Sequence, residues 1–510
     1  MNDEANHTSG GTPSAVAAPR RRRSLAALVA LNTTLLTAGR LLTSLVGLVG
    51  VAIATRYLGR DAFGQLTVAL GFVALFQSLP DLGLWTITAR EIARQPDHRD
   101  RLLSNAFTIG ALLSLLTFGV TLGLMALIYG DADDELLRRG VLILSVQLLF
   151  SAPAGAASAV LTAEQRAAPI AVAGVVASLT FLAIIPLVLA LDWGFTGIAA
   201  DYAAAGIVNA ILPLLAVRRG GGLRMARDSA LWGQLMRWAL PQGAVLVLSL
   251  LYFRIDTVLL SLLSTDAEVA LYGVGYKLNE VLVFLPLYFM VTLFPELARA
   301  QDASGRIAAL GQAAVSSLTL AALAVMVLCV PLAPEIVAVI GGSEEFDGAV
   351  PVVRLLAVAV ALVFVTTYFF HALVALNRQR ELVILILAVL AVNVALNAAL
   401  IPSLGAEGAA LALILSELAS LVMVAVAYAR LAPLPRLTKP TRLVAAALLG
   451  AGAAWAAAAI PGPDWLVLLI AGVTACVVYV AGLRLLSAVP LELERSLATL
   501  GGALRSRTTK

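Results

Sequence analysis

Long apolar stretches, separated by short polar or Gly/Pro-containing breaks, make up most of this chain. A transmembrane helix needs about 20 predominantly apolar residues. On that criterion the pattern predicts fourteen membrane-spanning helices, at residues 27–55, 64–87, 104–129, 140–162, 168–190, 195–217, 239–263, 269–294, 309–340, 350–375, 380–402, 405–429, 441–460 and 464–487. Because the breaks are short, we expect no sizeable soluble domain and predict an all-α polytopic membrane protein.

The composition supports this interpretation. Of the 510 residues, 60% are hydrophobic and 13% are charged, and the mean hydropathy is +0.94. A soluble domain is about 45–50% apolar and about 25% charged. Both cysteines, Cys329 and Cys476, lie in apolar stretches, so we interpret them as core residues and predict neither a disulfide nor a metal site.

Lys and Arg are unevenly distributed between alternate loops. With a cytoplasmic N-terminus, 27 of the 35 basic residues fall in cytoplasmic segments and four in exterior loops, which also hold acidic runs at 130–135 and 341–347. This bias predicts a multi-pass protein of the cytoplasmic (inner) cell membrane with both termini in the cytoplasm. The run Arg20–Arg23 would suit nucleic acid in a soluble protein, but here it indicates an orienting tail, and we expect no nucleic-acid partner.

A weak internal repeat divides the first twelve predicted helices into two halves. Phe63-Gly64 opens the second helix after a polar turn, and Tyr272-Gly273 opens the eighth helix in the same way, 209 residues later. Both halves begin on the cytoplasmic side. The repeat therefore predicts two pseudo-symmetric six-helix lobes related by an axis along the membrane normal, as in some transporters.

The predicted domain boundaries follow from this repeat. The segment Arg218–Gln234 is Gly-rich and basic, which is typical of a linker on the inner membrane surface. We predict a basic tail (1–24), an N-lobe of helices 1–6 (25–217), an amphipathic linker (218–238), a C-lobe of helices 7–12 (239–430), helices 13–14 (431–490) and a cytoplasmic tail (491–510).

Four basic residues fall in or at the edge of the predicted helices: Arg40, Arg254, Lys277 and Arg354. A charge at the bilayer centre costs at least about 2.5 kcal/mol unless it is paired or faces water. One interpretation is that each residue snorkels or pairs for packing. The other is that all four face an internal cavity that binds an anion, and guanidinium groups are well suited to phosphate. We predict that these residues bind a diphosphate head group.

Four carboxylates accompany these cations and are candidates for ion coupling: Asp81, Asp256, Glu280 and Glu417. Lys277 and Glu280 are three residues apart and can pair on one helix face. Such a pair is as often structural as functional, and a carboxylate at a helix end is often only a cap. Both interpretations stay open for each residue.

Motifs of catalysis are lacking in the sequence. The three histidines, His7, His98 and His371, have no metal-ligand spacing, and no Gly-rich phosphate loop follows a strand. We therefore expect no catalytic residue, no metal and no cofactor, and we predict that the protein is not an enzyme.

Three stretches resemble a known family. They are RYLGRDAFGQLTVALGFVALFQSLPDLGLWTITAREIAR (56–94), YFRIDTVLLSLLSTDAEVALYGVGYKLNE (252–280) and NVALNAALIPSLGAEGAALALILSE (393–417). They are similar to the polysaccharide-transporter family, whose members are flippases for lipid-linked oligosaccharides, in a superfamily with multidrug antiporters and lipid II flippases. The resemblance implies two six-helix lobes in a V around a central cationic cavity, plus two C-terminal helices. Carried over by position, Arg40 and Arg254 match best.

The sequence therefore predicts a flippase for an undecaprenyl-diphosphate oligosaccharide or a similar lipid-linked glycan, acting by alternating access in exopolysaccharide, capsule or O-antigen synthesis. The expected partners are this lipid-linked substrate, the bilayer, and polymerases or glycosyltransferases. Two alternatives from the same superfamily stay open, a lipid II flippase and a cation-coupled multidrug antiporter. A membrane-embedded glycan polymerase or ligase is disfavoured, because such enzymes need a large exterior loop and the predicted loops are short.

Overall fold

The computed structural model describes residues 25–130, 134–217, 224–300, 304–342 and 344–489. All regular structure within these residues is helical, which confirms the predicted all-α fold. The predicted tails, 1–24 and 491–510, lie outside the described residues, as does part of the predicted linker, 218–223.

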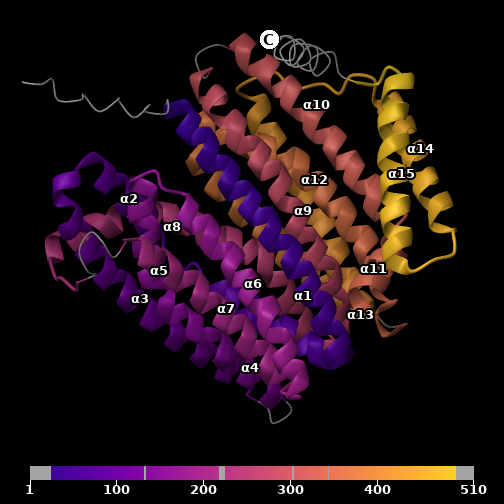
Figure 1. Cartoon of the computed structure of the whole chain (residues 1–510). Helices are drawn as coiled ribbons and strands as arrows, with labels where there is room; N and C mark the ends of the chain where they lie inside the picture. Colours follow the sequence, from indigo (N-terminus) through magenta and orange to yellow (C-terminus); the bar gives the residue numbers. More distant parts are fainter. Residues whose placement is uncertain (1–24, 131–133, 218–223, 301–303, 343, 490–510) are drawn as a thin grey trace, which may run out of the picture.

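The first seven helices form one lobe, which is indigo to magenta in Figure 1. Within it, α4 continues into α5 through a short 3-10 segment, Val146–Phe150, and the two together make one membrane crossing. The helices are α1 (Leu25–Phe76), α2 (Leu84–Arg94), α3 (Arg99–Ile128), α4 (Glu135–Ser145), α5 (Ser151–Ala163), α6 (Ala168–Ala190) and α7 (Gly194–Val217).

The second lobe follows, with α12 at its centre packed against α9, α10 and α13. The last two helices, α14 and α15, pack against each other and against α10 at the outer edge of this lobe (Figure 1). The helices are α8 (Ser229–Leu263), α9 (Asp266–Arg299), α10 (Ser304–Cys329), α11 (Ala333–Gly341), α12 (Ala349–Ala375), α13 (Gln379–Ala429), α14 (Pro440–Ala458) and α15 (Asp464–Leu485).

Two of these helices are each two membrane crossings joined at a glycine. The 52 residues of α1 would extend about 78 Å if straight, and the 51 residues of α13 nearly as far, whereas a bilayer with its head groups is about 40–45 Å thick. The helical dihedrals break at Gly59 (φ 72°) and Gly405 (φ 52°), in a region of φ that favours glycine. Dividing both helices there raises the 12 candidate membrane spans among the described residues to the predicted fourteen.

The two glycines of the sequence repeat lie where α1 and α9 cross. A Cβ atom on Gly64 would lie 2.0 Å from the backbone oxygen of Asp266, and a Cβ on Gly273 would lie 2.8 Å from the side chain of Thr67. A side chain at either position would force the helices apart. The repeat therefore marks the close contact between the two lobes.

Polar contacts join the lobes at this same end. Gln65 Nε2 donates to Asp266 Oδ2 at 2.9 Å, and Arg60 lies 3.7 Å from Glu268. The second oxygen of Glu268 accepts from the backbone N–H of Ala406 at 2.9 Å, just after the α13 break. The end of the molecule that holds Gly59 and Gly405 is thus held together from both lobes.

The segment before α8 is anchored to the first lobe. The Asn105 side-chain oxygen on α3 accepts from the Asp228 backbone N–H at 2.8 Å and from Trp232 Nε1 at 3.0 Å. Arg101 donates to Asp228 at 2.5 Å, and Asp228 also caps α8 by accepting from the Leu231 N–H. This cap starts α8 at Ser229, ten residues before the predicted C-lobe boundary at 239.

Candidate functional site

A cavity of about 940 Å³ lies between the two lobes. The first lobe contributes residues of α1 together with Gln147 and Tyr202, and the second lobe contributes residues of α8, α9, α12 and α13. The cavity reaches from Leu382, in the first turn of α13, to Phe63, four residues from the Gly59 break. It therefore extends through much of the membrane thickness, as the two-lobed prediction requires.

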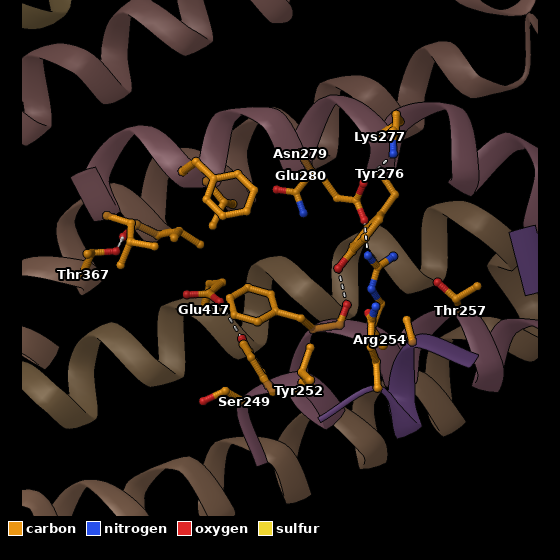
Figure 2. Close-up of a pocket in the computed structure, with 18 of the residues that line it drawn as sticks. Ser249, Tyr252, Arg254, Thr257, Tyr276, Lys277, Asn279, Glu280, Thr367 and Glu417 are labelled. Atoms are coloured by element: carbon orange, nitrogen blue, oxygen red, sulfur yellow. Dashed lines mark hydrogen bonds and ion pairs between the residues drawn. The ribbon is translucent and has the colours of Figure 1, made fainter. Parts of the chain in front are cut away.

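Three side chains on α8 and α9 form an ionic cluster in the cavity wall. Arg254 on α8 pairs with one oxygen of Glu280 on α9, and Lys277 Nζ donates to the other oxygen at 3.0 Å (Figure 2). About a quarter of each side chain is exposed. The cluster carries two positive charges and one negative charge, so Glu280 neutralises half of its cationic charge.

Arg40 lines the cavity from the first lobe. Its guanidinium carbon lies 4.3 Å from the ring centroid of Phe284 on α9, a cation–π contact, and among the described residues it makes no ion pair. A guanidinium group that stacks on a ring in this way keeps its N–H donors available at the ring edge.

The charged lining is positive overall but not uniformly so. Within the described part of the chain, three basic side chains, Arg40, Arg254 and Lys277, and two acidic ones, Glu280 and Glu417, face the cavity. His371 also lines it and bonds to the Thr367 carbonyl at 2.8 Å. The formal sum is one positive charge with both carboxylates ionised, less than the sequence-based expectation of four cations in one cavity.

Glu417 lies in a different part of the wall from the ionic cluster. It sits on α13 and is only 3% exposed. One of its oxygens accepts from the Tyr252 hydroxyl of α8 at 2.6 Å (Figure 2). Ser249 and Ser420, one turn away on the same two helices, also line the cavity.

Asp256 does not line the main cavity. It is 1% exposed and accepts hydrogen bonds from the Tyr272 hydroxyl at 3.2 Å and from Asn397 Nδ2 at 2.9 Å. A small recess beside the cavity is lined by both Asp256 and Glu417. Asp256 is therefore a buried, hydrogen-bonded carboxylate behind the cavity wall.

The structure places two further predicted residues outside the cavity. Arg354 was expected to bind substrate, but its exposed side chain donates to the Val330 carbonyl at 3.2 Å. Val330 follows the last residue of α10, where free carbonyls attract a cation, so the arginine is satisfied there. Asp81 accepts from the backbone N–H of Trp85 at 3.2 Å and so caps the start of α2.

Sequence reasoning missed most of the uncharged polar lining, including Tyr252, Gln147, Ser249 and Ser420. Such residues cost little in a membrane helix, so they leave no strong signal in an apolar stretch. The one available signal was helical spacing. Ser420 follows Glu417 at the i+3 position, and Tyr252 follows Ser249 at the same spacing, so each pair shares a helix face.

Two helical lobes surround a charged cavity, and solved structures of membrane transporters share this fold. A lipid II flippase, MurJ in an inward closed conformation, aligns with a TM-score of 0.74 at 12% identity, covering 88% of this chain and 98% of that chain. An inward-facing multidrug resistance MATE transporter of the MOP superfamily aligns with a TM-score of 0.65 at 17% identity, covering 76% of this chain and 94% of that chain. A MOP superfamily transporter from Pyrococcus furiosus, described as having a binding pocket of reverse polarity, aligns with a TM-score of 0.59 at 16% identity. The alignment covers 78% of this chain and 95% of that chain.

The sequence itself identifies the family. Residues 29–301 match the model of the family described as polysaccharide biosynthesis protein, and this match covers more than half of the chain. The chain belongs to that family, which confirms the resemblance seen in the sequence. No curated protein matches the sequence.

Proposed function

We propose that this protein is a flippase that moves a lipid-linked oligosaccharide, carried on a polyprenyl diphosphate such as undecaprenyl diphosphate, across the cytoplasmic membrane for polysaccharide synthesis. The observation that carries the proposal is that Arg40, Arg254 and Lys277, contributed by both lobes, line one inter-lobe cavity. Membership of a polysaccharide biosynthesis family and the transporter fold support it.

The chemistry of the cations favours a diphosphate ligand. Arg40 has no carboxylate partner among the described residues, so it is available to an anion. Arg254 and Lys277 keep one net positive charge after pairing with Glu280. A diphosphate offers several acceptor oxygens to guanidinium groups and repays part of the cost of charges at bilayer depth.

The proposed mechanism is alternating access between the predicted lobes. Gln65 and Arg60 of α1 contact Asp266 and Glu268 of α9 at the Gly59 and Gly405 end, and we take this as the closed side of the cavity in this conformation. By the distribution of Lys and Arg, that end faces the exterior and the basic loops face the cytoplasm. The head group enters from the cytoplasmic side while the lipid tail stays in the bilayer, and the lobes then rock to open the exterior end.

Ion coupling is assigned to fewer candidates than the sequence offered. Asp256 and Glu417 are buried carboxylates beside the cavity, and Glu280 is committed to two cations. Asp81 caps a helix outside the cavity. We keep Asp256 and Glu417 as the candidates for coupling and assign Glu280 to holding Arg254 and Lys277.

A multidrug antiporter is disfavoured by the charge of the lining, because Arg40, Arg254 and Lys277 outnumber Glu280 and Glu417 and give the cavity a net positive charge. The fold similarity to a lipid II flippase keeps lipid II as a second candidate substrate. Rescue of a strain depleted of its lipid II flippase would favour lipid II over another glycan.

Export in the native host tests the proposal. In a strain that lacks the chromosomal copy, Arg40→Gln and Arg254→Gln together should abolish polysaccharide export while the protein stays at normal levels in the membrane. Arg354→Gln is the matched control, since that arginine lies outside the cavity, and it should export normally. Full export by the double variant would contradict the proposal.

A further inference from the structure

The cavity has two chemically different walls. The cations lie on α1, α8 and α9, whereas Glu417 on α13 faces the cavity with Tyr252, Ser249 and Ser420 around it. Figure 2 shows Glu417 and Tyr252 apart from the cluster of Lys277, Glu280 and Arg254. The second wall presents hydroxyl groups, an aromatic ring and one carboxylate, and no basic side chain.

This second wall is unsuited to phosphate. A carboxylate repels an anion, and Glu417 has no basic partner among the described residues, because its one hydrogen bond comes from the Tyr252 hydroxyl at 2.6 Å. An ionised carboxylate only accepts hydrogen bonds, and serine and tyrosine hydroxyls both donate and accept. The ligand that fits is uncharged and rich in hydroxyl groups, with an apolar face to pack on an aromatic ring. A sugar ring has these properties.

The two walls meet in one cavity, because α8 contributes side chains to both of them. Tyr252 and Arg254 are two residues apart on α8, so their side chains leave the helix in different directions, yet both line the cavity. In a diphosphate-linked saccharide, the first sugar is bonded directly to the distal phosphate. A group that recognises that sugar must therefore line the same cavity as the phosphate-binding cations, as Glu417 and Tyr252 do.

Resting on the proposed function, we propose that Glu417, held by Tyr252, is a specificity-determining residue that binds hydroxyl groups of the first sugar of the lipid-linked substrate. The cations then bind the diphosphate without regard to the glycan. Glu417 and its neighbouring hydroxyls distinguish a sugar-bearing lipid from the bare lipid diphosphate.

Calorimetric titration of the purified full chain tests this assignment with two short-chain probes, farnesyl diphosphate and farnesyl-diphosphate-linked N-acetylglucosamine. The wild-type protein should bind the sugar-bearing probe more tightly. Glu417→Gln should weaken the binding of that probe by about tenfold, as expected for losing a hydrogen bond to a charged group. Its affinity for farnesyl diphosphate should stay within about twofold of the wild-type value. Arg254→Gln should weaken both probes.

Two further variants keep the test decisive. Tyr252→Phe keeps the ring and removes only the hydroxyl that holds Glu417, so it should weaken the sugar-bearing probe selectively and by less, about threefold to fivefold. Glu407→Gln is the matched control, because Glu407 is an exposed glutamate on the same helix, outside the cavity, and it should change neither titration.

The outcomes separate this inference from the function on which it rests. If the wild type binds neither probe, the proposed flippase function is wrong and the sugar site fails with it. If the wild type binds both probes equally, or if Glu417→Gln and Tyr252→Phe weaken both probes alike or neither, the cations bind the diphosphate and the sugar site alone is overturned.

Discussion

Arg254 and Lys277 share one carboxylate, Glu280, and this sharing determines how much positive charge the cavity presents. The Lys277–Glu280 pair could be predicted, because the residues are three apart on one helix. The Arg254–Glu280 pair joins two helices and could not, since sequence spacing says nothing about which face of one helix meets another. The sequence therefore predicted a more cationic cavity than the structure has.

Removal of the shared carboxylate should have opposite effects on stability and on anion binding. Glu280→Gln leaves two cations side by side, which should lower the free energy of unfolding by about 1–2 kcal/mol, less than for a fully buried pair because the cluster is partly exposed. It also frees both cations for a ligand, so farnesyl diphosphate should raise the melting temperature of the variant more than that of the wild type. An equal ligand-induced rise in both proteins would contradict this role of Glu280.

Asp201 is a residue that neither the cavity nor the predicted sites use. It is 1% exposed in α7, and neither of its carboxylate oxygens has a hydrogen-bond partner among the residues that the structure describes. A buried polar group left without partners costs about 1–3 kcal/mol. Asp201→Val should therefore raise the melting temperature by a few degrees, and a lower melting temperature would show that the carboxylate is needed for folding.

Arg40 and Arg354 show what depth in an apolar stretch can predict. Both residues stand out in the sequence because a charged side chain in a membrane helix costs free energy. That cost is also reduced when the side chain donates a hydrogen bond to a free carbonyl at a helix end. Arg354 does so at Val330, whereas Arg40 faces the cavity. The sequence shows that both arginines need a partner or an aqueous environment, and only the fold shows that Arg40 faces the cavity whereas Arg354 bonds to a helix end.

At the scale of elements, the helices were predicted well because each apolar stretch must cross the bilayer. The exceptions are the helix ends and two internal breaks: the predicted helix 64–87 is interrupted between α1 and α2, and the predicted helix 309–340 between α10 and α11. The α8 helix begins at Ser229 because Asp228 caps it, and this cap was overlooked inside a segment interpreted as a linker. The repeat glycines were noticed, but their partners, Asp266 and Thr67, became visible only in the α1–α9 crossing.

The α1–α9 crossing should depend on the missing side chain of Gly64. A methyl group there would lie 2.0 Å from a backbone oxygen, so Gly64→Ala should separate the lobes at that end and lower the melting temperature. Spin labels at Asp61 and Glu345, in a background without the two native cysteines, should report a longer distance by pulsed electron paramagnetic resonance.

Gly123→Ala is the matched control for this substitution. Gly123 is also a helical glycine, but a Cβ there would meet nothing within 4 Å. Alanine stabilises a helix relative to glycine by up to about 1 kcal/mol, so this variant should be as stable as the wild type or more so. An unchanged label distance in Gly64→Ala would show that the crossing does not set the lobe separation.

The anchor before α8 should depend on pH. The hydrogen bond from Arg101 holds the pKa of Asp228 below its ordinary value. Because the folded-state pKa is the lower one, this contact stabilises the fold at neutral pH, and its contribution is lost as the pH falls through that pKa. Arg101→Gln should lower the melting temperature at pH 7, and the difference should shrink on acidification towards pH 3. For Lys439→Gln, which loses only a bond to the Ser487 carbonyl, the difference should not vary with pH.

At the scale of the whole molecule, the two lobes give a single cavity its chemistry. Hydropathy and the repeat predicted the fold class, and the packing between helices defines the two lobes. In the proposed function the lobes and the cations serve any lipid diphosphate, so the identity of the glycan is not encoded at this scale. In the proposed assignment, specificity resides in a few side chains of one wall, with Glu417 first among them.

The most direct test of the account is the binding of a lipid diphosphate to the cavity. Calorimetric titrations of the purified protein with farnesyl diphosphate and with farnesol would compare the wild type, the double variant Arg40→Gln/Arg254→Gln, and Arg354→Gln. We predict that the wild type and Arg354→Gln bind farnesyl diphosphate alike, that farnesol binds much more weakly, and that the double variant loses about tenfold or more in affinity for the diphosphate. Equal affinity of the double variant and the wild type for farnesyl diphosphate would contradict the claim that these arginines receive a lipid diphosphate.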